Sequence, residues 1–142
     1  MVSWLLDTNV LSEATRPVPD AAVMHALTRY SGELAIAAPV WHELRFGWLR
    51  MPEGRRKDAI GHYLHDVVGS LPVLPYDMAA ARIHAEIRIE RERERDGMAM
   101  PFADGQIAAV AMAHGLTLVT RNQQDFSAIA GLRLANWWTP TA

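Results

Sequence analysis

The sequence has no cysteine and only one lysine, Lys57, against thirteen arginines. The absence of cysteine excludes disulfides and thiolate chemistry, and the single lysine argues against mechanisms that need a well-placed lysine. No apolar run approaches the ~20 residues that span a membrane. Residues 1–7 lack the basic start of a signal peptide and reach the carboxylate of Asp7 early. We therefore expect a soluble, cytoplasmic protein.

A strong positive charge is also missing, because the formal net charge is −2 at pH 7. This argues against a strongly basic nucleic-acid binder. It does not exclude a nuclease, because metal ions can supply positive charge at the cleaved phosphate. The 142 residues, half of them apolar, are enough for one core, so we expect a single domain over residues 1–142.

Short apolar runs alternate with helical patterns along the chain. Strands are expected at residues 2–6, 34–37, 73–74, 117–120 and, at the sheet edge, 132–135. Helices are expected at residues 8–14, about 21–31, about 39–49, 53–69, 78–95 and 103–114. This alternation predicts an α/β fold with three α/β/α layers, in which a mainly parallel sheet of four or five strands carries helices on both faces.

Particular residues set the expected ends and faces of these helices. Asp20 and Asp77 are expected N-caps, and Pro39 is expected at the first helical position. Gly97 is expected to end the long helix, whose alternating Arg and Glu predict a solvated face with i,i+4 ion pairs. The residues expected on buried helix faces are Trp41, Leu44, Trp48, Leu49, Ile60, Leu64, Val67 and Val68.

Carboxylates recur where the expected strands end. Asp7 follows the first strand, and Asn122 and Asp125 follow the fourth. Glu43 lies in the first turns of the helix after the second strand, and Asp104 begins the helix before the fourth. Because open parallel sheets bind ligands at the carboxyl ends of their strands, we expect these residues to gather at one edge.

Several carboxylates in one cleft repel each other, and a divalent cation relieves the repulsion. Mg²⁺ or Mn²⁺ fits an all-oxygen site, activates water and stabilises charge on a phosphoryl oxygen. Zinc fits less well, since there is no cysteine and no paired-histidine motif near these acids. Taken singly, each acid also fits an ordinary turn, cap or surface position, so the prediction depends on their convergence.

Four segments, in order, resemble the motifs of PIN-domain proteins. They are residues 5–13 (LLDTNVLSE), 41–47 (WHELRFG), 101–109 (PFADGQIAA) and 118–126 (LVTRNQQDF). The pattern is most similar to the VapC/FitB-like toxins of type II toxin–antitoxin pairs. The resemblance implies a magnesium-dependent endoribonuclease that is usually dimeric and is inhibited by a small VapB-like antitoxin encoded beside it.

The resemblance also implies roles for individual residues. Asp7 and Asp104 would be the principal metal ligands, and Glu43 would complete the acidic cluster as a ligand or water-orienting base. The side chains that would support the cleft are Thr8, Asn9, Thr120 and Asn122. Many PIN domains carry an aspartate where this chain has Asn122, and Asp125 could supply that charge instead. One metal ion is therefore expected.

Some features leave more than one interpretation open. Arg121 is a candidate for contact with an RNA phosphate, and Arg88, Arg91 and Arg95 are weaker ones. The Trp137–Trp138 pair fits either core packing or a dimer contact. Receiver and haloacid-dehalogenase-type phosphatase domains fit poorly, because the second acid each needs near Asp7 is absent. A non-enzymatic PIN-like module that binds RNA or a protein partner remains the alternative.

Overall fold

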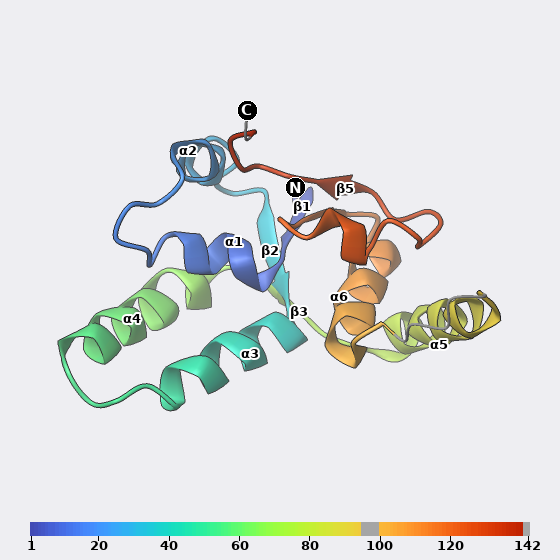
Figure 1. Cartoon of the computed structure of the whole chain (residues 1–142), viewed down its shortest axis with the longest axis horizontal. Coiled ribbons are helices and arrows are strands. Elements are labelled where there is room, and N and C mark those ends of the chain that lie inside the picture. Colours follow the sequence, from blue (N-terminus) through green and yellow to red (C-terminus); the bar gives the residue numbers. More distant parts are fainter. Residues whose placement is uncertain (95–99, 141–142) are drawn as a thin grey trace.

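The computed structural model describes residues 1–94 and 100–140 and has a parallel five-stranded sheet at its centre (Figure 1). The strands are β1 (Trp4–Leu6), β2 (Leu34–Ala37), β3 (Val73–Leu74), β4 (Thr117–Val119) and β5 (Leu134–Ala135). Their order across the sheet is β3-β2-β1-β4-β5, and every adjacent pair is parallel. The segment predicted as an edge strand is therefore β5, at one edge of the sheet.

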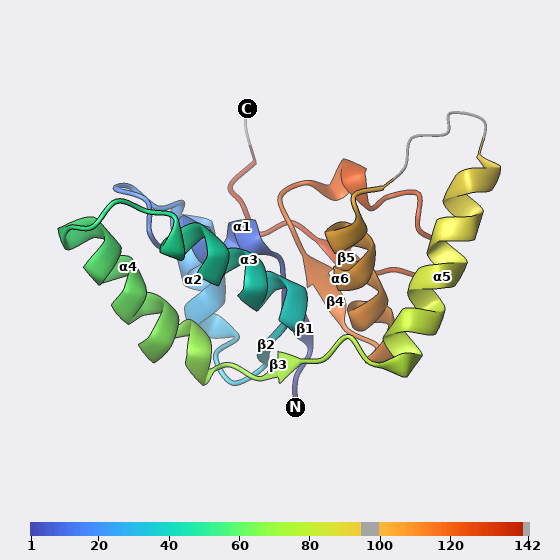
Figure 2. The ribbon, with the colours of Figure 1, turned by 90° about the horizontal axis from the view of Figure 1, so that it is seen from below.

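Helices cover both faces of this sheet. They are α1 (Thr8–Glu13), α2 (Ala21–Arg29), α3 (Ala38–Leu49), α4 (Arg55–Asp66), α5 (Met78–Arg93) and α6 (Phe102–Ala113), with 3-10 turns η1 (Val68–Ser70) and η2 (Gln123–Asp125). Figures 1 and 2 show α2 and α4 on one side of the sheet and α5 and α6 on the other. The predicted α/β architecture is confirmed.

The core consists of the central strands and α6. Leu5, Leu6 and Ile36 are fully buried, as is Leu118. Residues 107–111 of α6 are all buried, and the small alanines among them let the helix pack closely on the sheet and on α5. The core therefore lies directly beneath the residues that follow β1 and β4.

Aspartates begin two helices as predicted. Asp20 Oδ1 accepts hydrogen bonds from the backbone of Ala22 (3.0 Å) and Val23 (3.1 Å), which caps α2. Asp77 Oδ1 accepts one from the backbone of Ala80 (3.0 Å), which caps α5. Each carboxylate satisfies amides that the first helical turn leaves without partners.

Four local predictions are wrong. Ala38, not Pro39, is the first residue of α3. The segment 53–69, expected to be one helix, forms two elements, α4 and the tighter 3-10 turn η1. Val67 lies between them and is 53% exposed, whereas Val68 is buried. Leu49 is also exposed, since it lies about 100° around α3 from the half-buried Trp48.

The charged half of α5 differs from its predicted pattern. The ion pairs among its described residues are spaced i,i+3, with Arg91 bonded to Glu94 (3.1 Å) and Arg93 to Glu90 (2.9 Å). The helix also ends earlier than predicted, since α5 stops at Arg93 and Glu94 is extended. Gly97, the predicted end, and the candidate Arg95 lie outside the described residues. Within the described ranges, no helix is long and apolar enough to cross a membrane.

Candidate active site

Asp7 lies at the carboxyl end of β1 and is almost completely buried. Its backbone N–H donates to Val119 O (2.9 Å), which extends the pairing of β1 with β4 by one residue. Its Oδ1 accepts from the backbone of Thr8 (2.8 Å), and its Oδ2 accepts from Thr120 Oγ1 (2.7 Å). Both carboxylate oxygens are thus fixed, one by the start of α1 and one by the residue after β4.

The loop after β4 folds back onto this position. Thr120 Oγ1, which donates to Asp7, accepts a hydrogen bond from the backbone of Asn122 (3.1 Å). Asn9 Oδ1 accepts one from the backbone of Arg121 (3.4 Å). Asn9 and Asn122 therefore help to shape the loop beside Asp7, the latter through its backbone amide.

Glu43 approaches from α3. Thr8 Oγ1 donates to Glu43 Oε2 at 2.8 Å, which ties the first residue of α1 to the second carboxylate. Glu43 is exposed and lines two surface hollows of about 480 and 270 Å³. It is therefore held in place yet open to solvent and to a ligand.

Asp104 lies in the first turn of α6 and interacts electrostatically with the other acids. Burial, followed by the negative charges of Asp7, Asp125 and Glu43, raises its pKa to about 6. Burial also raises the pKa of Asp7, against the lowering effect of its bonds from Thr120 and Thr8, and the charges of Glu43 and Asp125 add to the rise. The four acids therefore lie near enough for their charges to affect Asp7 and Asp104, and the fourth charge is that of Asp125.

A buried histidine that the sequence analysis missed supports this end of α6. His84 Nδ1 is hydrogen-bonded to Tyr76 Oη (2.8 Å), and its ring lies 4.7 Å from that of Phe102, measured between centroids. Burial lowers the pKa of His84, with a further lowering from Arg88. A Cβ added to Gly105 would overlap the His84 ring. A glycine directly after Asp104 was therefore the sequence feature that could have indicated a side chain packed closely against this turn.

The donor set fits a hard divalent cation, because every candidate ligand is a carboxylate and two of their pKa values are raised. In the part of the chain that the structure describes, no three acidic or histidine side chains already form a group able to hold a metal ion. A cation bound here would therefore complete its coordination shell with water. Such a site suits Mg²⁺, which keeps several waters and takes one or two carboxylates.

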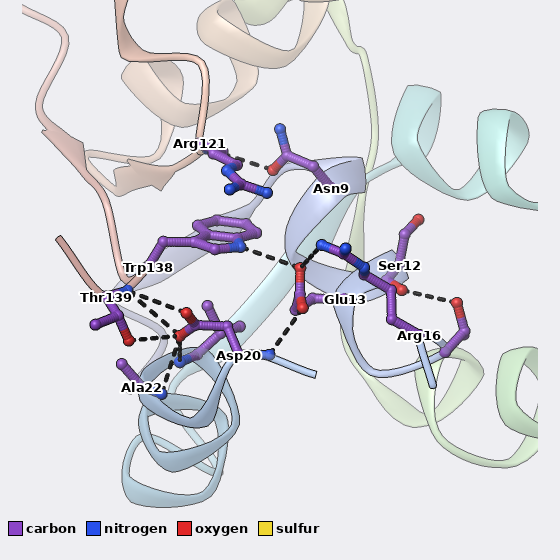
Figure 3. Close-up of polar contacts among 11 residues, drawn as sticks. Asn9, Ser12, Glu13, Arg16, Asp20, Ala22, Arg121, Trp138 and Thr139 are labelled. Carbon is purple, nitrogen blue, oxygen red and sulfur yellow. Dashed lines mark hydrogen bonds and ion pairs between the residues drawn. The ribbon is translucent and has the colours of Figure 1, made fainter. Parts of the chain in front are cut away.

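A second polar network, shown in Figure 3, lies at the other end of α1. The buried Glu13 accepts hydrogen bonds from the backbone of Asp20 (2.8 Å) and from Trp138 Nε1 (3.0 Å), with a longer contact from Arg16 (3.4 Å). The Arg121 guanidinium lies 5.4 Å from the centre of the Trp138 ring. The sequence analysis gave Glu13 no role, although it ends the first motif.

The remaining candidates lie elsewhere or pack internally. Arg88 lies over the ring of Phe102 (5.4 Å), and Arg91 pairs with Glu94 on α5. Trp138 is buried, and Trp137 packs edge-on against Trp4 with centroids 5.4 Å apart. Both tryptophans thus pack within this chain.

Comparisons with known proteins agree with this geometry. The model of the PIN domain matches residues 4–132. The "VapC ribonuclease Y4jK" of Sinorhizobium fredii is 39% identical, with 96% of this chain and 98% of the relative covered. "Toxin FitB" of Neisseria gonorrhoeae is 36% identical, with 94% and 97% covered. The solved structure of FitAB bound to an IR36 DNA fragment matches with a TM-score of 0.86 at 31% identity, and the match covers 98% of both chains.

Proposed function

Because this chain belongs to the PIN-domain family and to its VapC/FitB branch, we propose that it is an endoribonuclease and the toxin of a type II toxin–antitoxin pair. The observation that carries the proposal is the acidic site formed where β1, β4, α3 and α6 meet, with a pKa of about 6 at Asp104. A relative named as a ribonuclease and another named as a toxin support it. Its place of action is the cytoplasm, with RNA as substrate.

In this proposal Asp7 and Asp104 would hold a Mg²⁺ ion, for which Mn²⁺ could substitute, and Glu43 would complete the site. When bound, the ion supplies positive charge at the cleaved phosphate and makes a water molecule more acidic. Asp7 suits this task because its two oxygens are already oriented by Thr8 and Thr120. A preoriented ligand loses less conformational entropy when it binds.

Glu43 acts as the base. Thr8 orients its carboxylate, which is open to solvent and accepts the proton of the attacking water. The water oxygen forms a bond to phosphorus, the bond from phosphorus to the leaving ribose oxygen breaks, and that oxygen takes a proton from solvent water to leave as a hydroxyl. Asp125 contributes negative charge that strengthens cation binding without contacting the reacting atoms.

The protein partner in this proposal is a VapB-like antitoxin. The hollow of about 270 Å³ lies among α1, α3 and α4, with Leu11, Trp48 and Ile60 in its lining and Glu43 in its wall. An apolar antitoxin segment seated there covers Glu43 and blocks the site. We also expect the toxin to form a homodimer, which light scattering of the purified protein tests.

The decisive experiment follows cleavage of a fluorescent RNA by the purified protein. We expect cleavage with Mg²⁺ or Mn²⁺, none in excess chelator, and a loss of at least a hundredfold in Asp7→Asn and Asp104→Asn, the scale of lost transition-state charge stabilisation. Glu92→Gln, an exposed acid on α5, is the matched control and retains activity. Wild-type cleavage in chelator would refute the metal-dependent mechanism, and full activity of Asp7→Asn would refute the site.

One observation favours a second candidate function. Asn122 stands where many PIN domains have an acid, and in this structure only its backbone makes a described contact near Asp7. A PIN-like module with weak catalysis binds RNA or a protein without cutting. It predicts RNA binding by the wild type that is unchanged in Asp104→Asn, with no cleavage by either.

A further inference from the structure

Arg121 lies in the sequence between Thr120 and Asn122, which both help to form the acidic site. Its guanidinium nevertheless contacts a different part of the chain. Thr120 donates to Asp7, and the amide of Asn122 donates to Thr120. The guanidinium of Arg121 instead lies over the Trp138 ring, in the C-terminal segment (Figure 3). A flexible, exposed arginine is thereby restricted to one direction from the site.

Trp138 is itself fixed at several points. Its indole N–H donates to Glu13, and its backbone N–H donates to Asn136 Oδ1 (2.9 Å). The next residue, Thr139, donates through its hydroxyl (3.1 Å) and its amide (3.3 Å) to Asp20, the cap of α2. The ring beneath Arg121 thus belongs to a segment bound to the end of α1 and the start of α2.

Glu13 adds negative charge to this arrangement. It is 3% exposed, and the hydrogen bond from the backbone of Asp20, with those from Trp138 and Arg16, lowers its pKa despite burial. A charged, buried carboxylate strengthens the hydrogen bond that it accepts from the indole N–H, and so fixes the Trp138 ring. Tryptophan also offers the best aromatic face for a cation. Both effects favour the observed place of Arg121.

We propose that Trp138 and Glu13 are positioning residues that hold the Arg121 guanidinium where it contacts an RNA phosphate next to the cleaved one. This inference rests on the proposed ribonuclease function. Glu13 ends α1 and Asp7 caps its start, so along the helix they are separated by about 9 Å. The Trp138 indole binds the Glu13 end of α1, so we assign the guanidinium above it to a flanking phosphate, where it contributes to substrate binding more than to the chemical step.

Steady-state RNA cleavage tests the proposal. Arg121→Ala should raise KM about tenfold with kcat unchanged, the effect of losing a charged hydrogen bond equally in the bound substrate and transition state. Trp138→Leu should raise KM two- to fivefold, as for loss of a cation–π contact, while Trp138→Phe, which keeps an aromatic face, should stay within twofold of the wild type. The double variant Arg121→Ala/Trp138→Leu should be no worse than Arg121→Ala alone, because Trp138 acts through Arg121.

Two matched controls separate this role from general packing. Trp137→Leu removes the neighbouring indole, which packs on Trp4 and Tyr30, and should leave KM unchanged. Arg29→Ala removes another arginine that lies over an aromatic ring, that of Tyr30 at 5.5 Å, and should also leave KM unchanged. Equal effects of the control and test variants would overturn the proposal.

The possible results are distinguishable. If the wild type cleaves RNA but the effects of Arg121→Ala and Trp138→Leu multiply, or fall on kcat, the positioning role is wrong and the ribonuclease function stands. If the wild type neither cleaves nor binds RNA, both proposals are wrong.

NMR keeps the test decisive if Trp138→Leu fails to fold. In the wild type, the ring current of Trp138 should shift the Arg121 δ-methylene protons upfield. Adding an RNA oligonucleotide to the Asp104→Asn protein should move the Arg121 Nε–H and Trp138 Nε1–H signals together. The proposal would be overturned if the Arg121 δ-methylene protons show no upfield shift. It would also be overturned if the Arg121 Nε–H and Trp138 Nε1–H signals do not move when RNA is added.

Discussion

Thr120 Oγ1 donates a 2.7 Å hydrogen bond to Asp7 Oδ2, although the two residues are 113 positions apart in the chain. The contact is completely buried at Thr120 and joins the residues that directly follow β4 and β1. It makes the geometry of the first carboxylate depend on the register of two central strands.

Thr120→Val removes this hydroxyl while keeping the shape of the side chain. We expect the free energy of unfolding to fall by about 1–3 kcal/mol, because the buried Asp7 oxygen loses its donor. The pKa of Asp7 should rise further, since that hydrogen bond lowers it. Urea unfolding with a Thr117→Val control measures the loss. Equal stability of the two variants would contradict the account.

The pKa of Asp104 predicts how stability depends on pH without divalent cations. Because folding raises this pKa to about 6 from an ordinary value near 3.8, its contribution is fully present below pH 3.8 and is lost as pH rises through 6. Asp104→Asn carries no such proton. Its Tm should therefore rise relative to that of the wild type between pH 4 and pH 7, as calorimetry in chelator measures.

Magnesium should raise the Tm of the wild type above that of Asp104→Asn at neutral pH, which reverses the order expected in chelator. A cation that binds the ionised acids stabilises the folded protein above pH 6 and has little effect near pH 4, where Asp104 is protonated. If the Tm of the wild type at pH 7.5 is the same with and without Mg²⁺, the result would argue against the metal site.

The ends of the strands were predictable from the sequence, and with them much of the site. A buried apolar run followed by Asp7, and another followed by Thr120, place both residues at one edge of a parallel sheet. Asp104 follows from its place in the first turn of a helix that packs on the same sheet. These positions depend on local patterns and on the topology of the fold.

Contacts set by side-chain packing were not predictable. Glu13 meets Trp138 across 125 positions, and no periodicity links a helix end to a C-terminal segment. The exposure of Val67 depends on a local tightening of the chain that its apolar side chain does not indicate. The support that His84 gives to Gly105 likewise depends on the distance between α5 and α6.

Gly105→Ala tests that support. Because the new methyl group would overlap the His84 ring, we expect α6 to shift near Asp104, a loss of about 1–3 kcal/mol in stability, and weaker cleavage. His84→Ala/Gly105→Ala should recover part of the stability lost to the overlap. Gly47→Ala in α3 is the control, since a Cβ there meets nothing within 4 Å, and it should be neutral or stabilising. Additive effects of the His84 and Gly105 substitutions would exclude the clash.

Asp125→Asn tests whether the fourth acid acts through its charge. Asp125 is exposed, and its charge contributes to the raised pKa values of both Asp7 and Asp104. Removing that charge should lower both pKa values and weaken Mg²⁺ binding several-fold, measured by titration calorimetry, while Asn122→Asp should strengthen it. The double substitution moves the acid to the position that many PIN domains use and should restore binding close to that of the wild type. If Asp125→Asn binds Mg²⁺ as tightly as the wild type, the fourth charge does not belong to the site, and the three acids Asp7, Glu43 and Asp104 act without it.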